Sequence, residues 1–215
     1  MKAEQTHYQV GALYGFDQEQ YPDFTLNKGG CAATVACESC ILLQKNFGLK
    51  GLYPYDEQNV TFEDFNRFAM TMKPYLRPRL MGINKLSIYK EGFEAYLERI
   101  GEQRISMDLI EGSMPFEEAA SCLIRQLDAG LPVPFLMLSH TDRTLEDFIW
   151  HWFLLNGYEW DEAARDDGTP DYSSLRVRVC SYGEWVWLEL RRLWNTGYEK
   201  KGGMIFYRLH RSGQD

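Results

Sequence analysis

Residues 28–45 have the sequence KGGCAATVACESCILLQK, in which two glycines directly precede a cysteine, Cys31. After Cys31 the chain contains neither Gly nor Pro until Gly48, so nothing interrupts a helix there. Small and apolar side chains recur at helical spacing, at Ala32, Val35, Ala36, Ser39 and Leu43. We therefore predict a helix from Cys31 to about Lys45 with one face suited to close packing, ended by Gly48 and Gly51.

Three further segments predict helices. Residues 61–75 begin with Thr-Phe-Glu-Asp, a capping-box pattern in which a hydroxyl and a carboxylate satisfy free backbone N–H groups. Residues 88–100 are amphipathic. Residues 113–130 begin with Ser113 as a plausible N-cap and Pro115 in the first turn. The first thirty residues are rich in Gly, Tyr, Asp and Gln and predict irregular structure.

The character of the chain changes after Gly130, where short apolar or alternating segments predict strands. These segments are 133–138, 152–155, 175–180, 185–190 and 204–209, with an acidic surface loop expected at 159–174. Helices first and strands second indicate an α+β protein, in which an N-terminal helical part packs on a C-terminal antiparallel sheet. At 215 residues the chain fits a single domain, residues 1–215.

The net charge, the apolar runs and the cysteine content exclude several classes of protein. The net charge of −8 disfavours nucleic acid as a partner, because an acidic surface repels phosphate. No apolar run is long enough to span a membrane, and residues 1–7 lack a secretory apolar core. Five cysteines, an odd number, do not fit a secreted disulfide scaffold, so we expect a cytoplasmic protein. We expect no cofactor and no metal, since Cys37 and Cys40 resemble half a zinc site without a second ligand pair.

Cys31 is the first candidate for chemistry. The two glycines allow a tight turn and the close approach of a ligand, and the cysteine then lies at a helix N-terminus. The partial positive charge of that end favours the nucleophilic thiolate, so we predict a lowered thiol pKa. Its free N–H groups suit an oxyanion. The alternative is a buried structural cysteine, since cysteine is often buried.

His151 is the second candidate, within Trp150-His-Trp-Phe-Leu-Leu-Asn-Gly-Tyr158. The histidine opens an apolar strand, and a residue at a strand start can face a residue at a helix start across a cleft. The imidazole would then take the thiol proton and return it to the leaving group. A packed core histidine is the alternative for this residue alone, but the two candidates together favour a functional pair.

The order of these motifs resembles the papain-like cysteine peptidase superfamily. The similarity includes Gly30-Cys-Ala-Ala33 at a helix start, 151–158 with its Gly-Tyr ending, and 180–183, Cys-Ser-Tyr-Gly, in place of the family's Asn-Ser-Trp-Gly. Residues 130–136 are similar to the strand that precedes the histidine. The resemblance spans about residues 27–209 and is nearest to the bacterial leader-peptidase-like cysteine peptidases and their uncharacterised relatives.

The resemblance implies a papain-like fold and a catalytic centre with two departures from the family. The residue that orients the histidine corresponds to Cys180, which is a poor acceptor for an imidazole N–H. We expect Ser181, a backbone carbonyl or an acidic residue of the 159–174 loop to replace it. The oxyanion glutamine corresponds to Thr25, and Asn27 is the amide that we expect to serve instead.

The leading hypothesis is a cysteine-dependent hydrolase, either a peptidase or an amidase, or an acyl transferase, acting on a peptide or small acyl substrate. Cys31 would be the nucleophile and His151 the base and acid, with Ser181 and Asn27 in supporting roles. The rival is a catalytically impaired papain-like binding protein that uses the cleft for a peptide or small metabolite, which Cys180 favours.

The remaining histidines and one further cysteine carry weaker predictions. Cys122 is expected in the core. His140 is either a structural residue or a substrate contact near the cleft, and His7 and His210 are expected at the surface.

Overall fold

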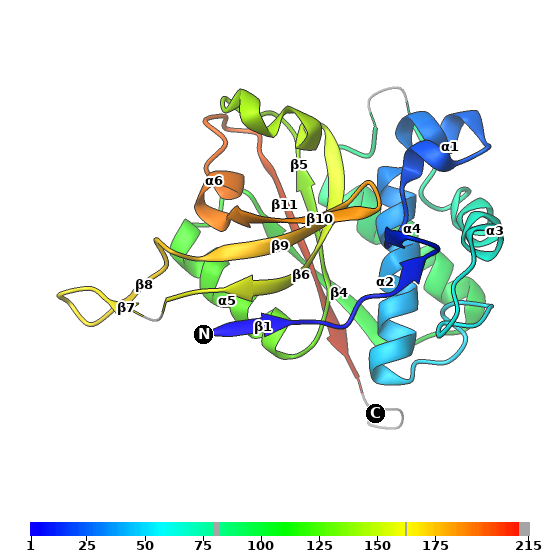
Figure 1. Cartoon of the computed structure of the whole chain (residues 1–215), viewed down its shortest axis with the longest axis horizontal. Coiled ribbons are helices and arrows are strands. Elements are labelled where there is room, and N and C mark those ends of the chain that lie inside the picture. Colours follow the sequence, from blue (N-terminus) through cyan, green and yellow to red (C-terminus); the bar gives the residue numbers. More distant parts are fainter. Residues whose placement is uncertain (80–81, 162, 211–215) are drawn as a thin grey trace.

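A buried helix, α2 (Cys31–Phe47), stands at the boundary between a group of helices and a sheet (Figure 1). The computed structural model describes residues 1–79, 82–161 and 163–210. Every residue of α2 from Cys31 to Gln44 is buried, because its many small side chains let neighbouring elements approach closely. Gly48 ends the helix in the left-handed conformation, with φ of 66°, which confirms the predicted end.

Two further helices lie on the same side of the sheet as α2. α3 (Phe62–Met72) begins after Thr61, whose hydroxyl accepts from the Asp64 N–H at 3.1 Å. The Asp64 carboxylate then accepts from that hydroxyl at 2.8 Å rather than from a backbone N–H, so only half of the predicted capping box forms. α4 (Leu86–Ile100) confirms the amphipathic helix expected at 88–100.

The residues before α2 are more regular than their composition predicts. A short helix, α1 (Phe24–Gly29), lies within the first thirty residues, which were expected to be irregular. Asp23 caps it, because its carboxylate accepts from the N–H groups of Thr25 and Leu26. The N-cap at Asp23 therefore favours a helix here, although the overall composition of the segment predicts irregular structure.

One antiparallel sheet of seven strands has the order β10-β9-β6-β5-β11-β4, and β1 pairs with β6 beside them. The strands are β1 (Lys2–Glu4), β4 (Ile105–Glu111), β5 (Val133–Met137), β6 (His151–Glu159), β9 (Arg176–Ser181), β10 (Glu184–Glu189) and β11 (Gly202–Leu209). An α+β protein with an antiparallel sheet is therefore confirmed. β6 is longer than the predicted 152–155, and β1 and β4 were not predicted.

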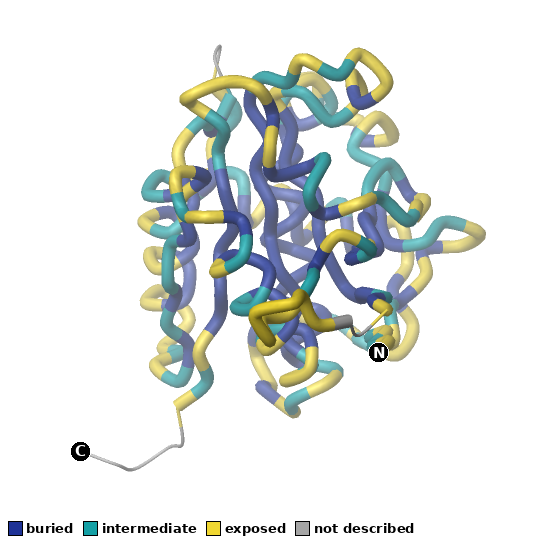
Figure 2. Tube along the Cα trace, turned by 90° about the vertical axis from the view of Figure 1, so that its left-hand side faces the viewer, coloured by how far each residue is buried: buried dark blue, intermediate teal, exposed yellow. Residues whose placement is uncertain are grey.

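Side chains alternate between the two faces of the sheet, and each face has its own core. On β6, Trp152 and Leu154 pack toward α2, while Phe153 and Leu155 pack toward the opposite side. There they meet α5 (Phe116–Asp128) and α6 (Leu190–Trp194). The strands form the buried middle of the molecule in Figure 2. The sheet is thus covered by helices on both faces, not on one as the order of elements suggested.

α5 departs from its prediction in place as well as in length. It packs on the face opposite α2, although sequence order assigns it to the N-terminal helical part. Its N-cap is Pro115 and no side chain caps it, so the helix starts after the predicted Ser113. A proline fits the end of the preceding extended chain because its φ is fixed and it has no N–H to satisfy.

The N-terminal segment, residues 5–20, connects the sheet to the helices. It leaves the sheet after β1 and crosses in front of α2 (Figure 1). It forms a small hairpin of β2 (Gln9–Val10) and β3 (Leu13–Tyr14), followed by the 3₁₀ turn η1 (Gln18–Gln20). Arg178, buried in β9, donates to the Gln5 carbonyl at 2.8 Å and fastens the start of the segment to the sheet.

The remaining described elements are short. They are η2 (Arg143–Phe148), which precedes β6, and the pair β7 (Ala163–Ala164) and β8 (Pro170–Asp171) within the loop expected at 159–174. Across the part of the chain that the structure describes, no helix is both long enough and apolar enough to cross a membrane.

Ala36→Leu is expected to destabilise the fold by about 1–3 kcal/mol, because Ala36 is fully buried in α2 and a larger side chain must displace its neighbours. Glu91→Leu, at an exposed position of α4, is the matched control with little expected effect. The urea midpoints of the three proteins measure the difference. An unchanged midpoint for Ala36→Leu would mean that α2 is loosely packed.

Candidate functional site

Cys31 and His151 come from different layers and line one small cavity. Cys31 is the first residue of α2 and His151 is the first residue of β6, and these two elements pack together. The cavity has a volume of about 10 Å³, room for roughly one water molecule. Gln18, Glu38 and Ser181 line it as well. Two residues far apart in the sequence therefore meet where a helix start and a strand start adjoin.

The Cys31 sulfur is buried among backbone N–H groups. Only 9% of the residue is exposed, and the backbone N–H groups of Trp152, Ala32 and Cys31 itself lie close enough to the sulfur to favour its thiolate. Burial nevertheless raises the pKa of the Cys31 thiol, because desolvation of the thiolate outweighs the three donors. The lowered pKa predicted from the helix N-terminus is therefore wrong for this sulfur.

The His151 ring is held at one nitrogen and on one face. Its Nε2 lies 2.7 Å from Ser181 Oγ, the hydrogen bond that we expected of Ser181. Tyr182 stacks on the ring with centroids 4.7 Å apart and planes within 4°. Burial lowers the pKa of His151 to about 4, so the ring is neutral near pH 7. With Nε2 engaged, Nδ1 is the nitrogen that can serve the thiol.

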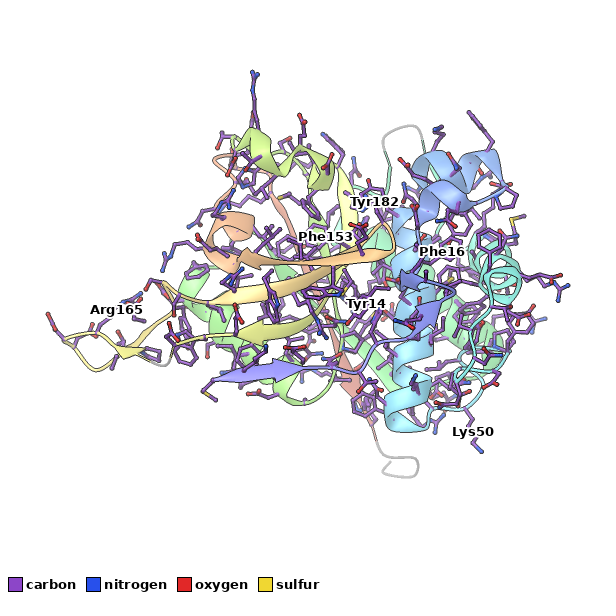
Figure 3. All side chains as sticks on the ribbon, viewed as in Figure 1. Tyr14, Phe16, Lys50, Phe153, Arg165 and Tyr182 are labelled. Carbon is purple, nitrogen blue, oxygen red and sulfur yellow. The ribbon has the colours of Figure 1, made fainter. Side chains whose placement is uncertain are left out.

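A tight turn between β9 and β10 delivers Ser181 and Tyr182 to the ring. Tyr182 and Gly183 both have positive φ, 52° and 73°. Two such residues in succession fit the type I′ turn, whose twist matches that of antiparallel strands. The Gly183 carbonyl accepts from the Tyr14 N–H at 2.7 Å, so a hydrogen bond from the N-terminal hairpin holds the turn in place. Figure 3 shows Tyr182 and Tyr14 near this end of the sheet.

Cys180 lines the same cavity but belongs to the core. It lies opposite Leu154 in the register of β9 and β6, and burial raises the pKa of its thiol, which stays neutral. A neutral thiol is a weak hydrogen-bonding group, so Ser181 takes the place beside His151. The 159–174 loop follows the far end of β6, so its acidic residues are not at the ring.

The structure does not bring Asn27 to the cavity. Asn27 lies in α1, and its side-chain Nδ2 donates to the carbonyl oxygens of Glu19 and, at 3.4 Å, of Tyr21. These bonds fasten the end of the N-terminal segment to α1. Thr25, where the resemblance placed an oxyanion residue, bonds to Asp23, the N-cap of the same helix.

Gln18 is a site residue that the sequence reasoning missed. It lies in η1 and lines the cavity, and its Oε1 is buried without a hydrogen-bond partner among the described residues. An amide before the cysteine is the signal that could have found it. Spacing concealed it, because the whole of α1 is inserted between Gln18 and Cys31.

Two weaker candidates turn out to be structural. His140 Nε2 lies 2.8 Å from the Arg192 carbonyl, and its Nδ1 accepts from the Asp142 N–H at 2.8 Å. Both ring nitrogens are therefore used within the protein, and nothing is left for a substrate. Cys122 is only partly buried, beside the core rather than in it, and His210 is exposed as predicted.

His7 is not the plain surface residue that the sequence predicted. Its ring stacks against Tyr8 and Tyr14, with centroid distances of 4.9 and 4.4 Å. Its Nδ1 accepts from the Asn156 side chain at 3.1 Å. Burial lowers the pKa of His7 to about 3, so it is neutral near pH 7. The pairing of β1 with β6 draws this residue inward, which no local pattern shows.

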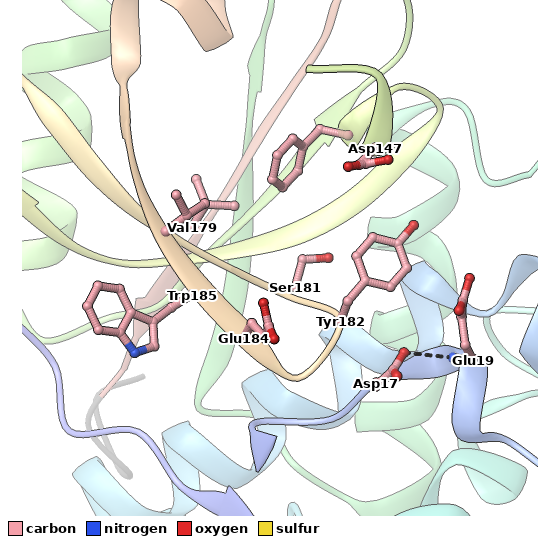
Figure 4. Close-up of a pocket in the computed structure, with 10 residues that line it drawn as sticks. Asp17, Glu19, Asp147, Val179, Ser181, Tyr182, Glu184 and Trp185 are labelled. Carbon is pink, nitrogen blue, oxygen red and sulfur yellow. Dashed lines mark hydrogen bonds between the residues drawn. The ribbon is translucent and has the colours of Figure 1, made fainter. Parts of the chain in front are cut away.

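A larger pocket of about 420 Å³ opens beside the pair. It shares Ser181 and Tyr182 with the small cavity, so it leads from the surface toward His151. Its wall includes the aromatic side chains of Phe148 and Trp185. Four carboxylates line it, from Asp17, Glu19, Asp147 and Glu184, and Figure 4 shows them around Tyr182. No Lys or Arg is among the described residues that line this pocket.

In comparisons with known proteins, no family model and no curated protein matched the chain. Within the described ranges, no group of three or more His, Cys, Asp or Glu side chains is arranged to hold a metal ion.

The alkylation rate of Cys31 by iodoacetamide is expected to keep rising as the pH approaches and passes 9.0, because its raised thiol pKa leaves little thiolate at neutral pH. Mass-spectrometric mapping measures the rate from about pH 6 to about pH 10. Cys122, which is partly buried, is an internal reference in the same sample. A rate at Cys31 that levels off near neutral pH would show a resting thiolate and contradict the neutral thiol.

Proposed function

We propose that the protein is a cysteine-dependent hydrolase, a peptidase or an amidase, or an acyl transferase, with a papain-like arrangement of helix and sheet. The observation that carries the proposal is the shared cavity of Cys31 and His151, with Ser181 on the far nitrogen of the ring. A nucleophile, a base and a group that orients the base are the parts that acyl chemistry at a thiol requires.

The reaction would start from a neutral thiol and a neutral imidazole. Cys31 Sγ attacks the carbonyl carbon while His151 Nδ1 takes the thiol proton, and the carbonyl electron pair moves to oxygen. The imidazolium then gives this proton to the leaving amine, alcohol or thiol, as its bond to carbon breaks and a thioester forms. Water, or an acceptor amine in acyl transfer, attacks the thioester. His151 takes the proton of this nucleophile and returns it to Sγ.

Two donors would hold the oxyanion. The Cys31 backbone N–H lies in the first turn of α2, where N–H groups have no acceptor within the helix. The Gln18 amide lines the cavity and replaces Asn27 in the role that we expected of an amide. The terminal torsion of glutamine is soft, so its Nε2 can turn toward the oxyanion at little cost.

The 420 Å³ pocket is the proposed place of the substrate, a peptide or a small acyl compound. Its carboxylates make the local potential negative, which favours cationic over anionic groups. The exposed Trp185 and the ring of Tyr182 add faces against which a cation or an aliphatic stem can pack. We therefore propose substrates with a positive charge close to the reacting carbonyl.

A binding protein without turnover is the second candidate, and two observations favour it. The cavity of about 10 Å³ is too small for a substrate carbonyl unless its walls move. A His151 pKa of about 4 also makes the ring a weak base near pH 7. In that case the larger pocket would bind a peptide or a small metabolite unchanged.

We also propose a reducing compartment, the cytoplasm, for this chain. All five cysteines are free thiols. Paired cysteines are expected where the surroundings are oxidising.

Ser181→Ala is expected to lower kcat for p-nitrophenyl acetate about tenfold with little change in KM, because one hydrogen bond that orients His151 is lost. Ser173→Ala, at an exposed position in the 159–174 loop, is the control. Cys31→Ala sets the background rate. If the wild-type rate equals that background, the binding protein is the better account. If Ser181→Ala is as active as wild type, Ser181 does not orient the base.

Peptide anilides that differ only in carrying Lys or Glu next to the scissile bond test the proposed charge preference. The Lys peptide is expected to have a kcat/KM about tenfold higher at low salt, and added salt should reduce the ratio. The double variant Asp147→Asn, Glu184→Gln removes two pocket carboxylates without changing their shape and should lower the ratio further. Equal use of both peptides would show that the pocket charges do not select the substrate.

A further inference from the structure

Glu38 is a buried acidic side chain that the proposed mechanism does not use. Only 4% of it is exposed. It lies on α2 about two turns beyond Cys31, on the same side of the helix, and lines the same cavity as Cys31 and His151. Burying a carboxyl group is costly unless hydrogen bonds compensate for the lost water. The partners of Glu38 therefore indicate what it does.

Both hydrogen bonds to Glu38 come from the N-terminal segment. Its Oε1 accepts from the Phe16 backbone N–H at 3.1 Å and from the Tyr8 hydroxyl at 3.2 Å. Phe16 itself stacks on Phe65 of α3, with ring centroids 4.2 Å apart. Figure 3 shows Phe16 beside α2, where the N-terminal segment crosses the helix. Glu38 thus connects α2 to this segment through hydrogen bonds.

The backbone at Gly15 is shaped to lie against the carboxyl group. Gly15 has φ of 81°, and a Cβ built there would overlap Glu38 Oε1 and approach His7 Nε2 to 2.8 Å. A side chain at this position would push the segment away from α2. The segment therefore lies in close contact with the buried carboxyl group at Gly15.

The Phe16 N–H that binds Glu38 directly precedes the residues that line the small cavity and the proposed substrate pocket. Gln18 follows Phe16 by two positions and lines the small cavity. Asp17 and Glu19, on either side of Gln18, line the larger pocket. Because the backbone from Gly15 to Gln18 is short, a fixed N–H at Phe16 limits where the Gln18 amide can lie.

We propose that Glu38 is a positioning residue, whose Oε1 holds the backbone at Phe16 and thereby keeps the Gln18 amide at the cavity of Cys31 and His151. The claim that Glu38 fixes the position of Gln18 does not rest on the proposed function. The claim that this position matters for turnover does rest on it. The role of Glu38 needs an acceptor oxygen at this place rather than a negative charge.

The surroundings of Glu38 keep the carboxyl neutral. Among the described residues, the ionisable groups near it are His7 and Tyr8 of the N-terminal segment, Tyr21 after η1, Cys37 of α2 and Cys180 of β9, with Cys31 and His151 lining the same cavity. None of them is a cation near pH 7, and burial raises the pKa of Glu38 to about 8. Glutamine keeps the acceptor oxygen and the shape of a neutral glutamic acid, so Glu38→Gln is a conservative variant, whereas Glu38→Leu removes the acceptor.

The first measurement reports the position of Gln18 without any need for activity. The side-chain amide signals of Gln18 are assigned in a ¹⁵N–¹H spectrum by their loss in Gln18→Ala. They are expected at the same shifts in wild type and Glu38→Gln, and near the values of an unstructured peptide in Glu38→Leu. If they stay unchanged in a folded Glu38→Leu, the proposal is wrong. Should Glu38→Leu not fold, Gly15→Ala disturbs the same contact, because its Cβ would overlap Glu38 Oε1, and unchanged Gln18 signals in it overturn the proposal equally.

The second measurement uses turnover of p-nitrophenyl acetate. Gln18→Ala is expected to lower kcat about 100-fold as the loss of an oxyanion donor. Glu38→Leu should lower it by a similar factor, Glu38→Gln should retain wild-type kcat, and the double variant Gln18→Ala, Glu38→Leu should lose no more than Gln18→Ala alone. Multiplicative losses would show that Glu38 acts independently of Gln18. A wild type without turnover would overturn the proposed function, while the Gln18 spectra would still decide the role of Glu38.

Discussion

The packing of the first turn of α2 against the first residues of β6 brings Cys31 and His151 to one cavity, and the rest of the site depends on it. It requires the helix to approach the sheet closely, which the small buried side chains of Ala32, Ala33 and Ala36 allow. β6 lies inside the sheet between β5 and β9, so its position is fixed on both sides. A thiol and an imidazole are therefore held in place by the core, not by a mobile loop.

The same close packing sets the chemistry of the pair. Burial raises the pKa of the Cys31 thiol and lowers that of His151, so both groups rest uncharged. Charge separation inside the site is costly in the resting state, on the order of several kcal/mol for each buried ion. In the proposed reaction, the N–H groups around the sulfur and the cavity would stabilise the charge that develops, which lowers the barrier more than it strengthens the binding of the substrate. The N-terminal segment is part of this enclosure, since Gln18 and the turn support at Tyr14 both come from it.

Sequence patterns predicted what is local and missed what is made by distant pairing. The helix from Cys31, its end at Gly48 and the strand that His151 opens follow from small-residue spacing, a glycine and an apolar run. The Ser181 bond was expected from motif order. The side of the sheet that α5 covers, the inward position of His7 and the place of Gln18 depend on how distant strands pair. The Cys31 pKa shows the same limit, because a helix N-terminus is a local feature and burial is a tertiary one.

The most direct test of the account is acyl trapping at Cys31. The protein is mixed with p-nitrophenyl acetate, quenched with acid at short times, digested and mapped by mass spectrometry. The account predicts an acetyl thioester on Cys31 that forms and is hydrolysed within the assay. Replacing His151 with glutamine should slow its formation, because no base then takes the thiol proton. Acetylation absent from Cys31, or equally fast without His151, would contradict the claim that these two residues form one catalytic pair.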